Sequence, residues 1–484
     1  MSKKNQNYTN RKQNRFQPER MRGNVFVNNS GKQWLPGENG RAAKVERLLR
    51  GAKEEKKEIA GNMAGYKDSG VEWIGAIPKV WSVNKGKYIF NQAKKKLVYD
   101  TDEIITCFRD GEVTLRKNRR TDGFTMSDKE IGYQGIDKGD LIIHGMDGFA
   151  GAIGISDSRG KASPVLMVLD TKQIKSYMKY HLRAMASSGA IAALTTGIRV
   201  RSCDLRFSKL ENILFAIPPL HEQQRIADFL DAKCDILDRT IDAVSRQIED
   251  LEKYKKALIT ETVTKGICKK SKPERAMKDS GVEWIGEDIP FDWDINRLQF
   301  CIDEISERNY AGKETHILSL MKDKGVIPYE EKGRVGNISK TDLTQYKLAY
   351  PNTLITNSMN IIIGSSGISQ YKGCVSPAYY VFKAKPNNDI RYFNYIFAVR
   401  AFQNECRRFA NGILEIRLRI SSTNLLKIKV PVPSPEEQQQ IADYLDEKCK
   451  NIDNRVQKRR QQLGWLKEYK KSLIFDYVTG KKRV

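Results

Sequence analysis

The side chains that could do chemistry in this sequence are cations and amides suited to binding nucleic acid. Arg and Lys donate hydrogen bonds to phosphate oxygens, and Arg, Lys, Asn and Gln can pair with base edges in a groove. In the first half of the chain the candidates are Arg109, Arg116, Lys117, Arg119, Arg120, His144, Arg199 and Arg201. In the second half they are Arg308, Lys313, Lys322, Lys324, Asn357, Asn360, Arg417 and Arg419. We predict that these residues contact DNA; the alternative for any one of them is an ordinary solvated charge.

Three of these residues belong to pairs in matched places of the two halves. His144 aligns with Asn357, and Asp147 aligns with Asn360; each pair follows a β-rich run and precedes a Gly-rich loop. If that loop faces a groove, these side chains contact bases. The alternative is a turn in which they bond only the local backbone.

The overall charge favours a polyanionic partner. The chain has 84 Lys and Arg against 59 Asp and Glu, a net charge of +25, and a pI near 9.5, as expected for a surface that binds phosphates. The 8 cysteines form no CxxC pair and the 4 histidines form no spaced ligand cluster, so we expect neither a zinc site nor disulfides. No signal peptide or run of 18 apolar residues is present, and we expect a cytoplasmic protein without a membrane span.

The elements that must position these side chains are duplicated. KDSGVEWIG begins at Lys67 and returns unchanged at Lys278, an offset of 211 residues. EQQRIADFLDAKCDILD begins at Glu222 and is matched by EQQQIADYLDEKCKNID at Glu437, an offset of 215. The chain therefore consists of two copies of one unit, each a globular part followed by a second part.

The globular parts read as α+β domains, because short β-rich runs such as DLIIH (140–144) and NTLIT (352–356) alternate with Gly and Pro and with a helical stretch near 390–409. The second part of each unit reads as one long helix. Its apolar residues recur in steps of three and four, as in a heptad seam: Cys234, Leu237, Ile241, Val244, Ile248, Leu251 and Leu258, then Cys449, Ile452, Val456, Leu463, Leu466 and Leu473. Lys255, Arg459 and Lys470 are polar intrusions in that seam.

The 38 residues from Glu222 to Ile259 would reach roughly 57 Å at ~1.5 Å per residue. One such helix cannot bury its apolar stripe alone, so we expect the two to pair. Antiparallel pairing would place the globular domains at opposite ends with pseudo-twofold symmetry, a spacing suited to two DNA half-sites with an unread gap. The predicted organisation is a basic, disordered arm (1–62), a globular domain (63–218), a helix (219–266), a linker (267–281), a second domain (282–433) and a second helix (434–480).

The pattern resembles a known family, the specificity subunits of type I restriction-modification systems. The residues that carry the resemblance are DSGVEWIG with a following Ile-Pro, IPPLHEQQRIADFLD (217–231), VPSPEEQQQIADYLD (432–446) and LKEYKKSLIFDYVTGK (466–481), over a region from about Lys67 to the C-terminus. The resemblance implies two target-recognition domains joined by two long helices, no catalytic centre, and a role in restriction and phage defence.

The resemblance also implies partners. It predicts double-stranded DNA, two modification subunits that carry S-adenosylmethionine and methylate adenine, and up to two endonuclease subunits that use ATP and Mg. No cofactor is expected in this chain. The helix starts are predicted to dock the modification subunits, through Glu222, Gln223, Gln224, Glu437, Gln438 and Gln439. Local capping of the helices is the competing explanation and is compatible with docking.

Residues 1–62 depart from the pattern, with 15 Lys and Arg against 6 Asp and Glu and no counterpart before the second copy. Either this arm adds a salt-sensitive grip on phosphates, or translation naturally starts at Met63.

Alternatives from other functional classes remain open at this point. GISDSRGK (154–161) has the wrong spacing for a phosphate loop, and its counterpart has Cys374 in place of Lys161. A nuclease or methyltransferase with a divergent active site is the main alternative, although duplication argues against it. A coiled-coil adaptor that binds RNA is the third.

Overall fold

The computed structural model describes residues 65–96, 99, 101–119, 132–193, 205–267, 275–286, 288–321, 324–333, 342–410 and 418–484. The predicted arm at 1–62 lies outside these ranges. The chain forms two compact units, of which the larger comprises Ser69–Gly75 and Val80–Val484. The described part of the smaller unit contains an antiparallel hairpin of β1 (Tyr66–Asp68) and β2 (Ala76–Pro78).

Within the larger unit, the first globular region is built on an antiparallel four-stranded sheet in the order β4-β11-β8-β9. Its strands are β4 (Phe90–Ala93), β11 (Leu166–Thr171), β8 (Leu141–His144) and β9 (Ile153–Ile155). Three two-stranded pairs accompany it: β3 (Ser82–Lys85) with β12 (Leu214–Ile217), β5 (Ile105–Cys107) with β6 (Val113–Leu115), and β7 (Gln134–Ile136) with β10 (Gly160–Ala162). The helices are α2 (Lys175–Ser187), α3 (Ala190–Ala193) and α4 (Phe207–Leu210), with 3-10 turns η2 (Gly86–Tyr88), η3 (Arg116–Asn118) and η4 (Gly148–Ala150).

The second globular region repeats this plan, with a four-stranded sheet in the order β16-β23-β20-β21. Its strands are β16 (Ile302–Glu304), β23 (Tyr379–Ala384), β20 (Leu354–Asn357) and β21 (Ser366–Ile368). The two-stranded pairs are β15 (Asp294–Arg297) with β24 (Lys429–Val432), β17 (Leu318–Met321) with β18 (Gly325–Pro328), β19 (Lys347–Ala349) with β22 (Gly373–Val375), and β13 (Met277–Asp279) with β14 (Asp288–Pro290). The helices are α6 (Ile390–Ala398), α7 (Arg400–Arg408) and α8 (Ser422–Leu426), with η5 (Leu298–Phe300), η6 (Tyr329–Lys332) and η7 (Ile361–Ile363).

Both regions are mixed α+β, as the sequence predicts. Strand β8 reads Leu-Ile-Ile-His and buries its first three residues, so both of its faces are covered and it lies inside the sheet. The helical stretch expected near 390–409 is two helices rather than one. Val399 between them is extended (φ −72°, ψ 127°), and this interrupts the helix after Ala398.

Two long helices connect these regions. Helix α5 spans Leu220–Lys265 and α9 spans Pro435–Val478, where the sequence analysis placed helices at 219–266 and 434–480. The 46 residues of α5 correspond to about 69 Å at ~1.5 Å per residue. Helix α9 begins at Pro435 because Ser434 caps it. The Ser434 hydroxyl accepts a hydrogen bond from the Glu437 amide at 3.2 Å, and a proline is favoured at the first helical position.

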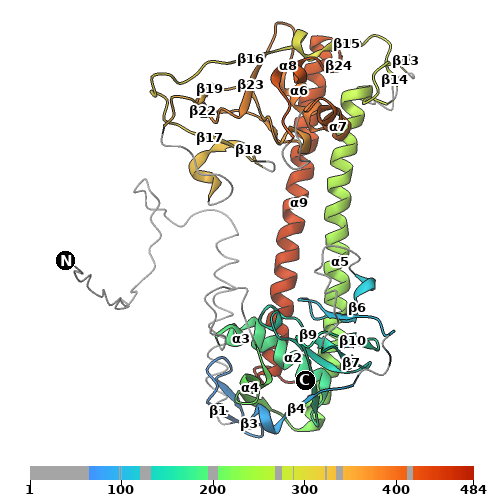
Figure 1. The fold of residues 1–484 in the computed structure, drawn as a ribbon, viewed down its shortest axis with the longest axis vertical. Helices are drawn as coiled ribbons and strands as arrows, with labels where there is room; N and C mark the ends of the chain where they lie inside the picture. The colour runs from blue at the N-terminus through green and yellow to red at the C-terminus, as the bar shows by residue number, and fades with distance from the viewer. Residues whose placement is uncertain are drawn as a thin grey trace, which may run out of the picture. The chain divides into compact units, whose positions relative to one another are not determined.

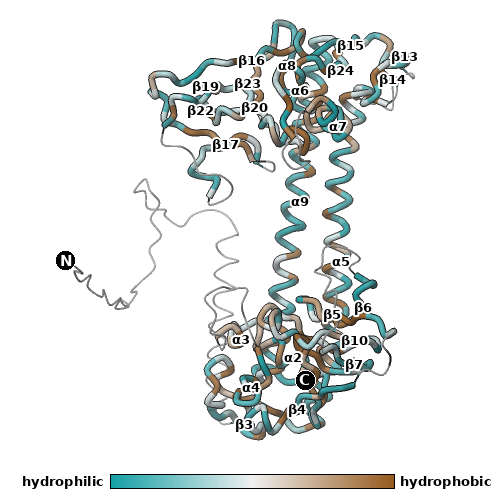
Figure 2. The backbone as a smooth tube through the Cα atoms, in the orientation of Figure 1, coloured by the Kyte–Doolittle hydropathy of each residue, from teal (hydrophilic) through white to brown (hydrophobic). Residues whose placement is uncertain are grey.

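Helices α5 and α9 lie side by side and run antiparallel (Figure 1). The direction follows from their ion pairs, because Lys470 of α9 pairs with Asp238 of α5, whereas the earlier residue Asp453 pairs with the later Lys255. Between these pairs, Val244 and Ile248 pack against residues 452 and 456 of α9. Most residues along the two helices between the globular regions are hydrophilic (Figure 2), so the apolar seam is narrow.

Candidate nucleic-acid interface

Each long helix is fixed at its start by a buried glutamine. Gln223 is fully buried; its Oε1 accepts from the Ile174 amide at 3.1 Å, and its Nε2 donates to the Pro218 carbonyl at 2.8 Å. Gln438 makes the corresponding bonds, with the Asp389 amide at 3.0 Å and the Pro433 carbonyl at 3.0 Å. Both amides therefore tie the N-terminal turn of a long helix to the segment just before α2 or α6.

A buried tryptophan supports each start. The indole of Trp81 donates to Glu222 at 3.1 Å, and that of Trp293 donates to Glu437 at 2.9 Å. The tryptophan that follows each Ile-Pro in the sequence repeat therefore contacts the acidic residue that opens the second repeat. The two motifs, which are far apart in the sequence, therefore contact each other in the fold and together fix the start of each long helix.

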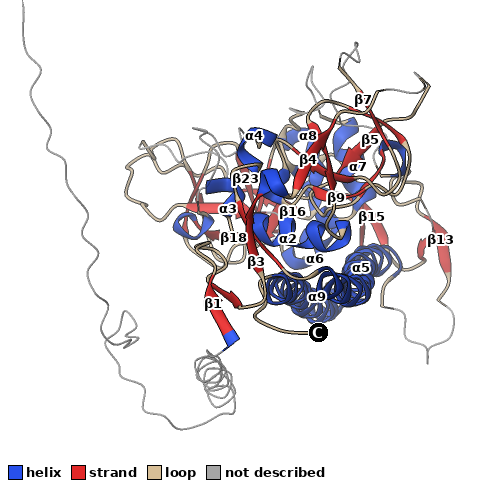
Figure 3. Ribbon diagram, turned by 90° about the horizontal axis from the view of Figure 1, so that it is seen from below, coloured by secondary structure: helices blue, strands red, loops and turns tan. Residues whose placement is uncertain are grey.

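A tyrosine ties each region to the far end of the other long helix. The Tyr177 hydroxyl, on α2, lies 3.4 Å from the Ala216 carbonyl and 3.2 Å from that of Val478, at the end of α9. The Tyr392 hydroxyl, on α6, lies 3.0 Å from the Pro431 carbonyl and 3.1 Å from that of Val263, near the end of α5. Helices α2 and α6 each pack against both α5 and α9 (Figure 3). Each region is thus held where one long helix starts and the other ends.

A carboxylate about two turns further along each long helix strengthens the anchor. Asp231 accepts from Ser176, Lys179 and Tyr180. Burial acts to raise the pKa of Asp231, but these donors outweigh it and lower that pKa. Asp446 accepts from Tyr395 at 2.6 Å in the second region.

These contacts bear on the residues predicted to dock modification subunits. Glu222, Gln223, Glu437 and Gln438 all bond within this chain, and the two glutamines are fully buried. Gln224 and Gln439 are exposed. The local role that competed with docking is therefore present, and docking through the exposed positions stays a prediction.

The basic run of the first region surrounds the β5–β6 pair. Its cations are mostly exposed and bonded to nearby carboxylates: Arg109 to Asp147 at 2.8 Å, Lys117 to Glu103 at 2.6 Å, and Arg119 to Asp110 and Glu112 at 2.7 Å. Arg116 lies in η3 and reaches Thr106 at 3.4 Å. Exposed ion pairs contribute only about 0.2–1 kcal/mol each, so a phosphate can displace such carboxylates at small cost.

The cations of the second region are more dispersed. Arg308 donates to Gln345 at 3.2 Å, and Lys313, Lys324 and Arg419 are exposed. Lys324 precedes β18, whose pair with β17 is the counterpart of β5–β6. Arg120, Arg199, Arg201, Lys322 and Arg417 lie outside the described residues.

The matched residues after the central strands bond the local backbone. His144 Nδ1 accepts from the Asp147 amide at 3.1 Å, and Asn357 Oδ1 accepts from the Met359 amide at 3.0 Å. Burial lowers the pKa of His144. Asn357 is itself buried, whereas Asn360 is exposed. The locally bonded turn that the sequence left as an alternative is therefore present in both regions.

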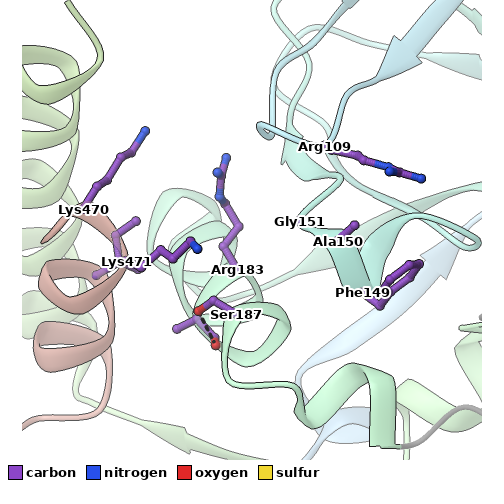
Figure 4. Close-up of a pocket in the computed structure, with 10 residues that line it drawn as sticks. Arg109, Phe149, Ala150, Gly151, Arg183, Ser187, Lys470 and Lys471 are labelled. Carbon is purple, nitrogen blue, oxygen red and sulfur yellow. Dashed lines mark hydrogen bonds between the residues drawn. The ribbon is translucent and has the colours of Figure 1, made fainter. Parts of the chain in front are cut away.

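Sequence reasoning predicted that Arg109 contacts DNA but missed the cations beside it, at the junction of the first region with the helix pair. Arg183 of α2, Lys470 and Lys471 of α9, and Arg109 line one pocket there (Figure 4). Lys470 appeared in the sequence only as a polar interruption of the seam. Arg183 carried no signal, because nothing in the sequence says that this face of α2 turns toward α9.

Two kinds of feature are absent from the described ranges. Among these residues, no three His, Cys, Asp or Glu side chains lie together in a way that could hold a metal ion. No described helix is long and apolar enough to cross a membrane.

Comparison with known proteins gives one consistent result. Residues 297–463 match the family described as Type I restriction modification DNA specificity domain. The Type I restriction enzyme MjaVIII specificity subunit of Methanocaldococcus jannaschii is 26% identical over 427 residues, covering 84% of this chain and 94% of that protein. The putative MjaX specificity subunit of the same organism is 24% identical over 442 residues, covering 85% and 96%.

A solved structure shares the fold. A chain from a study of complex assembly and conformational transition of the type I R-M system superposes with a TM-score of 0.59 at 14% identity, covering 84% of this chain and 99% of that one. The duplicated anchors, the matched sheets and these relatives agree: residues 297–463 match the DNA specificity domain, and most of the chain is similar to the specificity subunits of type I restriction-modification systems.

Proposed function

We propose that this chain directs a type I restriction-modification complex to its DNA sequence by reading a site in two parts. Each globular region reads one half-site, and the base pairs between the halves are not read. The chain supplies recognition and not catalysis. Its net charge of +25 provides the phosphate attraction that such binding requires.

The observation that carries the proposal is the duplicated anchoring of the two regions. Gln223 and Gln438 fix the helix starts, while Tyr177 and Tyr392 fix each region to the end of the other helix. We read this as a pseudo-twofold molecule whose helices α5 and α9 form a coiled coil. Such a frame sets the distance between two reading surfaces, which a two-part DNA site needs.

The partners and cofactors belong to the same proposal. Two modification subunits carry S-adenosylmethionine and methylate adenine, and up to two endonuclease subunits use ATP and Mg. The exposed Gln224 and Gln439, at the two helix starts, are the proposed docking positions for the modification subunits. The proposed place of action is the cytoplasm.

The test is a genome-wide map of N6-methyladenine in a host that carries this chain and its modification partner, compared with the same host lacking this gene. We expect a two-part motif with a fixed gap that disappears on deletion. Unchanged methylation, with the partner still expressed and active, would contradict the proposal.

Replacing residues 67–218 by the same region of another specificity subunit provides the finer test. We expect one half of the motif to change while the other half is retained. A change in both halves would mean that the regions do not read independently.

A further inference from the structure

We propose that the pocket between α2 and the C-terminal part of α9 binds a phosphate of the DNA backbone, and that the corresponding place in the second region does not. This inference rests on the proposed function and adds an asymmetry to it. The two half-sites would be read by matched regions, but the first would have an additional contact to the sugar-phosphate chain.

The first observation is the charge of the pocket. Ten residues line it, four of which are the cations Arg109, Arg183, Lys470 and Lys471, and none of which is acidic. The same cations also line the larger hollow next to it, whose carboxylates are Asp110, Glu112, Asp238, Asp242 and Glu468. In Figure 4, Arg183 of α2 and the two lysines of α9 lie around the same space, whereas the Arg109 side chain on the other side of the pocket extends away from them and pairs with Asp147. Arg183 and the two lysines, which come from two elements, suit a ligand with several anionic oxygens, and Arg109 lies at the edge of the same hollow.

The second observation is the state of Arg183. It is half-buried, and the structure gives its guanidinium no ion-pair partner within the described ranges, whereas Lys470 and Lys471 pair with Asp238 and Glu468. A partly desolvated cation without a counter-ion is unfavourable, and a bound phosphate would compensate it. Arg also presents a planar fork that matches phosphate oxygens.

Packing against a turn holds Arg183 in this position. Gly111, in the β5–β6 turn, has a φ of +92°, and a Cβ built there would lie 1.5 Å from Nη1 of Arg183. The guanidinium therefore occupies the space that a side chain at residue 111 would fill. The same turn carries Arg109, so the pocket continues directly into the basic run predicted to contact DNA.

The second region lacks this arrangement. By the offset of 215 that relates the long helices, Ala398 stands in place of Arg183, and Ala398 lines the corresponding pocket. That pocket also contains the carboxylates Asp446 and Asp453, and its Lys255 is already paired with Asp453 at 2.7 Å. Its two lysines, Lys255 and Lys450, are balanced by these two carboxylates, so a phosphate would find little net positive charge there. Because Lys470 is paired with Asp238 as Lys255 is with Asp453, the difference between the two places rests on Arg183.

The experiment measures the affinity of the full-length chain for duplex DNA as a function of salt. The probe is a fluorescent duplex of arbitrary sequence, about 40 base pairs long. This exceeds the length of the helix pair, because a helix of about 69 Å corresponds to ~20 base pairs at ~3.4 Å per base pair. The variants are Arg183→Ala, which copies the second region, and Lys471→Ala. The matched control is Lys256→Ala, the equivalent of Lys471 on α5 and also exposed.

Each lost phosphate contact should reduce the slope of log K against log salt by about 0.9. We expect that reduction in slope for Arg183→Ala, together with a fall in affinity of about 3- to 30-fold at low salt. Lys471→Ala should reduce the slope less, and Lys256→Ala should leave the slope unchanged. Because a phosphate contact ignores sequence, duplexes of different arbitrary sequence should weaken equally. Arg183→Lys, which retains the charge, should recover part of the slope, and thermal melting identifies any variant that has unfolded.

Three results would overturn the inference. In the first, folded Arg183→Ala keeps the wild-type slope. In the second, Lys256→Ala loses as much slope as Arg183→Ala, so that no asymmetry exists. In the third, the DNA slopes are unchanged while binding of the modification subunit weakens, which would make the pocket a site for an acidic protein surface. Failure of the wild-type chain to bind any duplex would instead count against the proposed function.

Discussion

At the scale of single residues, His181 shows how two copies of one unit can diverge inside a shared core. It is fully buried on α2, and neither ring nitrogen has a hydrogen-bond partner in the described structure. Its ring packs near Trp73, at 5.5 Å between centroids, and near Phe215, also at 5.5 Å. The Val478 backbone lies near enough to the ring to oppose in part the effect of burial on its pKa. The offset of 215 aligns it with Ile396, which is also fully buried. His181 thus fills an apolar position with an ionisable ring.

This burial predicts a pH-dependent stability. Desolvation lowers the pKa of His181 from 6.5 to about 4. The unfolded chain therefore binds the proton more readily than the folded chain does. The free energy of unfolding is therefore unaffected by His181 above about pH 6.5. It falls as the pH decreases toward 4, by up to ~3 kcal/mol in total.

The measurement is urea unfolding at pH 7.5 and pH 5, for the wild type and for His181→Leu. We expect the substitution to remove part of the acid destabilisation and to have a smaller effect at pH 7.5. His221→Leu serves as the control, because His221 is exposed. Parallel pH dependence in wild type and His181→Leu would assign the acid sensitivity to other groups.

At the scale of elements, the seam of α5 and α9 combines apolar contacts with two matched ion pairs. Lys470 lies 2.6 Å from Asp238, and Lys255 lies 2.7 Å from Asp453. The lysines are the more buried partners, with 17% and 30% of their side chains exposed against 53% and 59% for the aspartates. Each pair can form only in the antiparallel register, so the pairs help to specify it.

Exchanging the charges tests this role. Asp238→Lys should place two cations together and destabilise the chain by about 1 kcal/mol, because the pair is partly solvent-screened. The double variant Asp238→Lys with Lys470→Asp should recover most of that loss. Thermal unfolding at low and high salt measures both effects, and high salt should reduce the difference.

Asp250→Lys, at an exposed position of α5, is the control for charge alone. If the double variant were no more stable than the single one, the contact would contribute nothing to the register.

The long helices could be predicted from the sequence, whereas the contacts that anchor them could not. The heptad steps predicted the long helices because burial of one stripe depends on spacing along a single segment. The anchors were not predictable in the same way. Gln223 bonds the amide of Ile174, 49 residues away, and Tyr177 reaches Val478, 301 residues away. Polar contacts at such separations depend on the folded path, as does the placement of Arg183 beside Lys470 and Lys471.

At the scale of the whole molecule, the proposed coiled coil would couple the length of the helices to the gap in the DNA site. One heptad inserted in both helices adds about 10.5 Å, or ~3 base pairs. Over that length DNA turns by about 110° in the right-handed sense, while a supercoil of ~150 Å pitch turns by only about 25° in the opposite sense. If one region faces its half-site, the other would then be rotated away from its own half-site by an angular error of roughly 135° about the DNA axis.

Three heptads change this outcome. They add about 31.5 Å, close to one DNA turn of ~34 Å, and the angular error falls to roughly 50°. We therefore predict that insertions after Glu249 and Lys458 abolish methylation when they are one heptad long. Insertions of three heptads should restore methylation at a motif whose gap is longer by about 9 base pairs.

The measurement is the same map of N6-methyladenine, with an in-place exchange of one native heptad for the inserted sequence as the control for composition. Efficient methylation by the one-heptad variant at a gap longer by about 3 base pairs would show that the regions turn freely about the helix pair. The anchors at Gln223, Gln438, Tyr177 and Tyr392 argue against that freedom, since each region is bonded to both long helices. A frame held in this way fixes angle as well as distance, and only the comparison of one heptad with three separates the two.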